Sequence, residues 1–156
     1  LTSIRIAKEF GVKLTLDHCT DGSVIADELA KEGYPAFVGP SLGGKSKIEL
    51  INKAFSTPAD LAQAGVNVSI ITDAPVIPLQ HLPMCAGLAA NAGHGYEEAW
   101  RAITINPARA LEIDDRVGSL EPGKDADVVI WTADPIKSVG AEAMVTIVDG
   151  KIVYKQ

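Results

Sequence analysis

The sequence predicts an α/β fold with parallel strands, followed by a small antiparallel β layer. Helical patterns that end at a glycine alternate three times with short apolar runs typical of strands. Such alternation favours parallel strands joined by right-handed crossovers. After Ile113 the helical periodicity gives way to period two and to hairpin turn signals. We therefore expect two parts, an α/β part over residues 1–112 and a β part over residues 113–156.

The first half of the chain contains the three repeats of helix and strand. Their helical patterns end at Gly11, Gly33 and Gly65. The expected elements are, in order, a helix over 4–10 and a strand over 12–16; a helix over 22–32 and a strand over 36–38; and helices over 47–55 and 58–64 before a strand over 68–71. The first strand leads into His18 and the third leads into Asp73, so two polar residues follow buried strands.

The second half of the chain is helical before it becomes β-like. A helical pattern covers residues 78–93, and a further helix is expected over 96–103. Asn106 and Pro107 form an N-cap and first-turn pair that starts another helix, which extends to residue 111. The β part is expected to contain a strand over 117–120, a turn over 121–124, a strand over 127–131 and a hairpin over 144–154 about Asp149-Gly150.

Composition places the chain among globular proteins and excludes several partners. Its 156 residues are 47% hydrophobic and 22% charged, which suffices for one core. The net charge of −6 argues against a nucleic-acid or anionic-membrane surface, and no apolar run has the length that a bilayer requires. Cys19 and Cys85 have no metal, redox or disulfide spacing, so we expect small core residues and a cytoplasmic location. The chain opens on Leu1 within a helical pattern, so a fragment is expected.

His18 and Asp73 are the first candidates for a functional site. Both follow predicted parallel strands, whose carboxyl ends meet at one edge of a sheet. Imidazole and carboxylate are ligands for a zinc-like or manganese-like ion, which lowers the pKa of bound water and polarises a carbonyl. Two structural alternatives stay open: Asp73 caps the turn before Pro75, and His18 hydrogen-bonds to its own loop. His81 and His94 have no ligand spacing, so we expect both to face solvent or to cap helices.

The stretch Gly39–Ser46 fits the phosphate-loop pattern G-x-x-x-x-G-K-S. It follows a predicted strand and precedes an expected helix. Against a phosphate loop, Pro40 lacks the backbone donor that a phosphate cradle uses. The preceding apolar run is also only about three residues, whereas strands have roughly five to six. The alternative is a loop that covers a neighbouring site while Lys45 stays in water.

Two segments of the second half carry a family resemblance. They are TINPARAL at Thr104–Leu111 and VGSLEPGKDADVVI at Val117–Ile130. Together they resemble the C-terminal signature of the metal-dependent amidohydrolase superfamily. Thr72–Val76 and Leu16–Cys19 are most similar to the imidazolonepropionase-related branch, and the similarity extends over essentially the whole chain.

The resemblance implies both a fold and a site. Members of this superfamily have a (β/α)8 barrel with one or two metals, and a small β-sandwich built from segments before and after the barrel. By resemblance, residues 1–112 form the C-terminal portion of a TIM-like barrel, strands six to eight, and residues 113–156 supply strands of the sandwich. His18 is then a metal ligand at the end of strand six. Asp73 is the strand-eight carboxylate that binds metal and acts as the catalytic base toward the attacking water. The implied cofactor is a divalent metal ion, zinc.

The resemblance also identifies what the chain lacks. The paired histidines of strand one, the bridging residue of strand four and the histidine of strand five have no counterparts here, and a full barrel needs about 250 residues. We therefore expect a fragment that is inactive alone. We also expect self-association into a homo-oligomer, because part of a barrel exposes a sheet edge and an apolar interior.

The parent protein is expected to hydrolyse amide bonds of a small molecule, such as a cyclic amide or a dipeptide. The metal and Asp73 would activate the attacking water. The alternative from a different class is a non-catalytic, self-associating domain. A nucleotide binder that uses Gly39–Ser46 is the third hypothesis. No nucleic-acid or membrane partner is expected.

Overall fold

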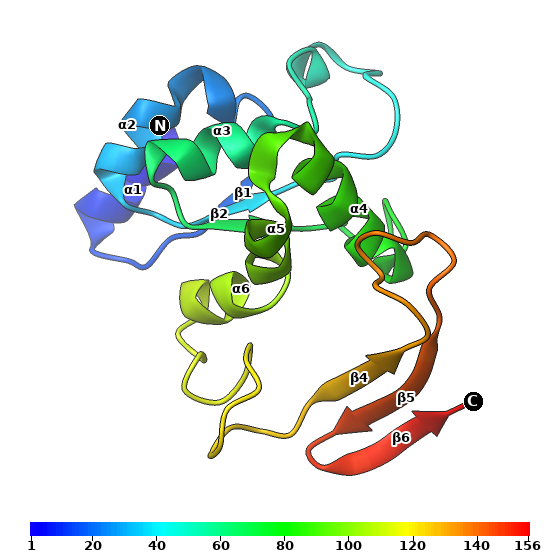
Figure 1. Ribbon diagram of the computed structural model, residues 1–156. Helices are drawn as coiled ribbons and strands as arrows, with labels where there is room; N and C mark the ends of the chain where they lie inside the picture. The colour runs from blue at the N-terminus through cyan, green and yellow to red at the C-terminus, as the bar shows by residue number, and fades with distance from the viewer.

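The computed structural model describes residues 1–156 and contains two separate sheets with helices around the first (Figure 1). The α-helices are α1 (Thr2–Phe10), α2 (Ala26–Glu32), α3 (Thr57–Ala64), α4 (Leu82–Ala89), α5 (Tyr96–Ala102) and α6 (Ile105–Ala110). The strands are β1 (Leu16–His18), β2 (Ala36–Val38), β3 (Val68–Ile70), β4 (Val128–Trp131), β5 (Ala143–Val148) and β6 (Lys151–Lys155). None of the helices combines the length and the apolar character that crossing a membrane requires.

The first sheet is parallel, with β2 between β1 and β3. In its register Leu16 pairs with Ala36, and Ala36 pairs with Val68, so the three strands end at one edge. The helices α1, α2 and α3 lie together on one side of this sheet (Figure 1). The predicted alternation of helices and parallel strands is confirmed.

The predicted helix ends at glycines are confirmed as well. Gly11, Gly33 and Gly65 are the C-caps of α1, α2 and α3, with left-handed φ angles of 62°, 74° and 102°. A residue with a side chain adopts this backbone region at a cost, which explains why glycine marks these three ends.

The first strand begins later than the sequence predicts, at Leu16 rather than Val12. The N–H of Val12 still bonds to the carbonyl of Ala7, 3.1 Å away, and so closes the end of α1. The N–H of Leu16 makes a hydrogen bond of 2.9 Å to the carbonyl of Pro35, just before β2. Residues 12–15 therefore form the connection from α1, and the strand continues through His18 instead.

The buried core consists of two clusters. The first lies between the parallel sheet and its helices, and its members are Ile4, Leu16, Leu29, Ala36, Val38, Leu61, Val66 and Val68. The second joins β3 to α4 and α5, and its members are Ile70, Cys85, Ala86, Ala89, Ala99, Ala102 and Ile136. Gly87 allows the segment that carries Ile136 to approach α4, because a Cβ there would lie 2.3 Å from the Ile136 carbonyl oxygen. This contact docks the segment between β4 and β5 against α4.

The second sheet is antiparallel, in the order β4-β5-β6. The predicted hairpin is confirmed: Asp149 and Gly150 have φ angles of 49° and 73°, as a two-residue type I′ turn requires. The predicted strand over 117–120 is wrong, since that segment is irregular. The two sheets fall on opposite sides of Ile113. The division into parts over 1–112 and 113–156 stays a prediction.

The helix predicted over 47–55 is wrong. Only a 3₁₀ turn, Ile48–Leu50, forms there. Ile48 and Ile51 are 80% and 60% exposed, so the expected apolar face has nothing to pack on, and a helix this short depends on such packing. Lysine side chains fold the segment on itself instead: Lys45 donates to the carbonyl of Ile51, and Lys53 donates to the carbonyl of Gly43.

Candidate functional site

His18 and Asp73, the two residues predicted to form a site, meet at the carboxyl edge of the parallel sheet. His18 is the last residue of β1, and Asp73 lies three residues beyond the end of β3. The Nε2 atom of His18 is 3.1 Å from the Oδ2 atom of Asp73, although 55 positions separate the two residues in the sequence. Their side chains are 53% and 40% exposed, so both reach the surface. The structure therefore brings together the two side chains that the strand pattern singled out.

The backbone at this edge has uncommon conformations. His18, Cys19 and Asp73 have positive φ angles of 69°, 46° and 53°. Non-glycine residues rarely adopt this region, at a cost of about 1–3 kcal/mol each, and such residues concentrate at functional sites. The turn after β3 is closed by backbone bonds, with the N–H of Val76 donating to the carbonyl of Asp73 at 2.8 Å. Backbone groups therefore close this turn, and the Asp73 carboxylate contacts His18 instead of capping the turn.

The donor set suits a divalent metal ion. Two ligand atoms about 2.0–2.1 Å from one tetrahedral zinc ion lie roughly 3.4 Å apart, which is close to the observed separation of nitrogen and oxygen. Within residues 1–156 no group of three or more His, Cys, Asp or Glu side chains is placed to hold a metal. A catalytic zinc site has three protein ligands plus water, so a third ligand would come from outside these residues.

The two cysteines are structural, as predicted. Cys19 follows His18, and its thiol donates to the carbonyl of Leu16 at 3.3 Å. Burial, followed by the negative charge of Asp17, raises the pKa of the Cys19 thiol to about 11. Cys85 is buried in the second core cluster, where burial also raises the pKa of its thiol. Both thiols therefore stay protonated near neutral pH, which disfavours a role as nucleophile or metal ligand.

The prediction that His94 faces solvent or caps a helix is wrong. His94 is only 6% exposed, at the end of the π-helical turn Ala90–His94, and neither ring nitrogen has a hydrogen-bond partner. This turn packs on α3, where a Cβ at Gly93 would lie 3.8 Å from the Ala59 side chain. Burial lowers the pKa of His94, while the charge of Glu98 acts in the opposite direction. His81, by contrast, is partly exposed.

We expect His94 to make stability depend on pH. The ordinary pKa of histidine is about 6.5. Below this pH the His94 side chain becomes protonated in the unfolded chain, whereas burial keeps it neutral in the folded protein. The free energy of unfolding should therefore fall as the pH drops from this value to the lower pKa of the folded state. Urea unfolding at about pH 7, 6 and 5 measures the effect, which His94→Leu should reduce and His81→Leu should retain. Equal slopes for wild type and His94→Leu would contradict this assignment.

The stretch Gly39–Ser46 does not have the geometry of a phosphate loop. No α-helix follows it directly, so the helix N-terminus that such a loop uses for phosphate is missing. The Nζ atom of Lys45 is instead 2.8 Å from the carbonyl oxygen of Ile51. The pattern match is accounted for by a surface loop that folds on itself.

We expect no saturable binding of a nucleotide to this loop. Titration of labelled ATP with magnesium measures it, with Lys45→Ala as the comparison variant. The physical reason is that the Lys45 ammonium group already donates a hydrogen bond to the backbone carbonyl of Ile51 in the same segment. A micromolar affinity that disappears in Lys45→Ala would show that the loop binds phosphate after all.

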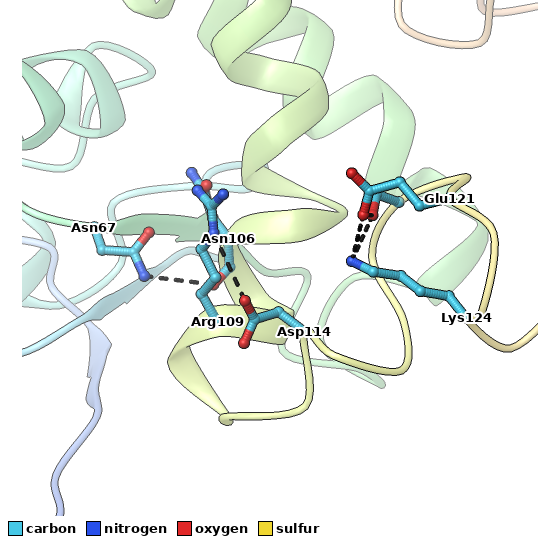
Figure 2. Close-up of polar contacts among 7 residues, drawn as sticks. Asn67, Asn106, Arg109, Asp114, Glu121 and Lys124 are labelled. Carbon is cyan, nitrogen blue, oxygen red and sulfur yellow. Dashed lines mark hydrogen bonds and ion pairs between the residues drawn. The ribbon is translucent and has the colours of Figure 1, made fainter.

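A polar network that the sequence reading missed lies at the other end of β3 (Figure 2). Asn106, predicted as an N-cap, sits inside α6, and its Nδ2 atom donates to the carbonyl of Val68 at 2.9 Å. The side chain of Asn67 donates in turn to the carbonyl of Asn106 at 3.4 Å. Nearby, Lys124 is only 13% exposed and pairs with Glu121 at 2.9 Å. The two asparagine contacts fasten α6 to the start of β3, whereas the Lys124–Glu121 pair lies within one turn. The only advance signal was the polar residues within the TINPARAL and LEPGK segments.

The chain is similar to known proteins over most of its length. The model of the amidohydrolase family matches residues 1–153. An imidazolonepropionase from Maricaulis maris is 35% identical over 136 residues, which cover 83% of this chain and 32% of that protein. The structure of an amidohydrolase from Thermotoga maritima superposes with a TM-score of 0.95 at 38% identity, over 99% of this chain and 40% of that one. The chain thus spans about a quarter to a third of the length of the imidazolonepropionases it matches.

One further structural neighbour bears on the metal. An adenosine deaminase from Xanthomonas campestris, solved with bound zinc, superposes with a TM-score of 0.65 at 25% identity. The match covers 92% of this chain and 37% of that protein. The resemblance predicted from the sequence is confirmed.

Proposed function

Because the chain belongs to the amidohydrolase family, we propose that it forms the His18 and Asp73 side of the site in a metal-dependent hydrolase of C–N bonds. The observation that carries this proposal is the 3.1 Å approach of His18 Nε2 to Asp73 Oδ2 at the carboxyl edge of the parallel sheet. Functional groups of α/β barrels gather at this edge. The substrate class we propose is a small molecule with an amide bond, such as a cyclic amide or a dipeptide.

We assign Asp73 two roles and His18 one. Both would hold a divalent metal ion, for which zinc is our proposal because imidazole nitrogen and carboxylate oxygen are its usual donors. When bound, such an ion lowers the pKa of water and polarises the carbonyl to be attacked. The exposed Asp73 carboxylate is placed to accept the proton that the attacking water releases.

The proposed architecture is a (β/α)8 barrel in which β1, β2 and β3 are strands six to eight. The similarity to the Thermotoga maritima amidohydrolase over nearly the whole chain supports it. We propose further that β4, β5 and β6 belong to a small β-sandwich. In support, no residue of these three strands is buried, although most of them are apolar. The free cysteines favour a cytoplasmic location.

Elemental analysis and turnover assays of the full-length protein test this function together. We propose that the full-length protein binds a divalent metal and hydrolyses small amides. The isolated segment 1–156 should bind metal weakly, because it supplies only two of the ligands. A metal-free full-length protein without hydrolase activity would contradict the proposal and favour a non-catalytic domain.

We propose that residues 1–156 alone form homo-oligomers or precipitate. Ile152 and Val153 of β6 are 64% and 61% exposed, and Ile130 of β4 is 49% exposed. Adjacent exposed apolar side chains on a sheet with a free edge favour association. Light scattering at several concentrations measures the oligomeric state. A compact monomer at all concentrations would contradict the expectation.

A further inference from the structure

Gly39 occupies the point where the backbones that lead to His18 and Asp73 converge. It follows β2, the central strand, and is buried. On one side its N–H donates to the carbonyl of His18 at 3.2 Å. On the other side the N–H of Ile71, two residues before Asp73, donates to the carbonyl of Val38 at 3.0 Å. The strand ends that carry both site residues are therefore fastened to the residues around this glycine.

The approach to β3 leaves no room for a side chain at Gly39. A Cβ there would lie 2.1 Å from the carbonyl oxygen of Ile71, a distance that real Cβ atoms essentially never show, and 3.0 Å from its carbonyl carbon. The backbone also has a φ of +147°, which L side chains rarely adopt. Since the nearest atoms are backbone atoms, a side chain could be accommodated only if the backbones of Gly39 and Ile71 moved apart.

The other glycines of the loop differ in this respect. A Cβ at Gly43, where φ is +101°, or at Gly44 would meet no atom within 4 Å. The first glycine of the G-x-x-x-x-G-K-S pattern is therefore required by a close backbone contact, while Gly43 and Gly44 occupy open space.

We propose that Gly39 is a positioning residue that sets the separation between His18 and Asp73. The proposal rests on the function proposed above, because the separation matters only if the two side chains act together. A Cβ at this position would push Ile71 outward and carry the turn with Asp73 away from His18. Glycine at position 39 thus permits the 3.1 Å contact between His18 Nε2 and Asp73 Oδ2, although it touches neither of these side chains.

The matched pair Gly39→Ala and Gly43→Ala tests this role in the full-length protein. Both variants introduce a methyl group at a positive φ, but only the first meets a backbone atom. In metal-free crystals of Gly39→Ala we expect the Nε2–Oδ2 separation of His18 and Asp73 to exceed about 3.5 Å, the limit of a hydrogen bond. We expect Gly43→Ala to keep the wild-type contact. An unchanged contact in Gly39→Ala would overturn the inference whether or not the protein binds metal.

Zinc affinity supplies the second readout. We expect Gly39→Ala to bind zinc about 10- to 100-fold more weakly than wild type, as is typical when a group that orients a ligand is altered. In an Asp73→Asn background the same change should have no further effect, since the pair is already broken. Additive losses would point to a general structural role and overturn the inference. If wild-type protein binds no zinc, the proposed function fails, and the crystallographic separation still decides the role of Gly39.

If Gly39→Ala does not fold, wild-type protein labelled with ¹⁵N-glycine and with ¹³C at the histidine carbonyl replaces it. The Gly39 amide should show a coupling across its hydrogen bond to the His18 carbonyl. Its resonance should also move in Asp73→Asn, while those of Gly43 and Gly44 stay in place. A Gly39 resonance that is insensitive to Asp73→Asn would overturn the inference.

Discussion

Replacing Asp73 by asparagine in the full-length protein is expected to lower kcat for amide hydrolysis by at least about 100-fold, the usual loss when a general base is removed. Asparagine has nearly the shape of aspartate, so the turn after β3 should persist. The amide cannot accept the proton of the attacking water, and it lacks the charge that favours a metal ligand. Steady-state kinetics with a small amide substrate measure the loss.

Metal content and a matched control separate the two roles of Asp73. Asp27→Asn makes the same chemical change at an exposed position in the first turn of α2, so its turnover should stay near wild type. Elemental analysis of Asp73→Asn then shows whether metal is retained. Retained metal with lost turnover would isolate the role as base, and loss of both would reflect the role as ligand. Near-normal turnover would remove Asp73 from catalysis.

The parts of the fold that local sequence determines were predictable. The glycines at 11, 33 and 65 end helices because left-handed backbone at a C-cap favours glycine wherever the helix lies. Asp149-Gly150 specifies its hairpin in the same local way. The pairing of His18 with Asp73 was also predictable, since parallel strands place their carboxyl ends at one edge whatever the intervening sequence.

The errors arose where tertiary contacts decide the outcome. Asn106 has the residue type and the following proline of an N-cap, yet its amide is used by the Val68 carbonyl on another element. His94 lies between glycines in a segment that looked exposed, but the packing of its turn on α3 buries it. The helix expected over 47–55 lacked a surface to pack against. None of these contacts leaves a periodic signal in the sequence.

The role of Gly39 could not be predicted from the sequence, for a related reason. The sequence pattern around Gly39 indicated a phosphate loop. The structure explains the glycine instead by the carbonyl of Ile71, just past the end of β3 and more than thirty positions later in the sequence. The short distance that excludes a side chain at position 39, 2.1 Å from a Cβ to the Ile71 oxygen, arises only after β2 and β3 have paired. A glycine required by a close backbone contact therefore resembles a glycine required by a ligand until the fold is known.

Replacing Leu61 by alanine is expected to have the largest effect on stability, a loss of about 2–5 kcal/mol in the free energy of unfolding. Leu61 is 0% exposed and belongs to the first core cluster. Its Cδ1 and Cδ2 atoms lie under Gly22, where a Cβ would be 3.1 Å and 3.3 Å from them. Gly22 in turn donates its N–H to the carbonyl of Cys19 at 2.8 Å, next to His18. The cavity would therefore open beneath the turn that directly follows His18.

Urea unfolding of the full-length protein measures this loss, with Leu120→Ala as the control. Leu120 is 78% exposed, so removing the same atoms there should change the free energy of unfolding by at most about 0.5 kcal/mol. We expect Leu61→Ala to weaken zinc binding as well, because the turn after β1 loses its support. A difference of less than about 1 kcal/mol between the two variants would mean that Leu61 is not part of a closely packed core.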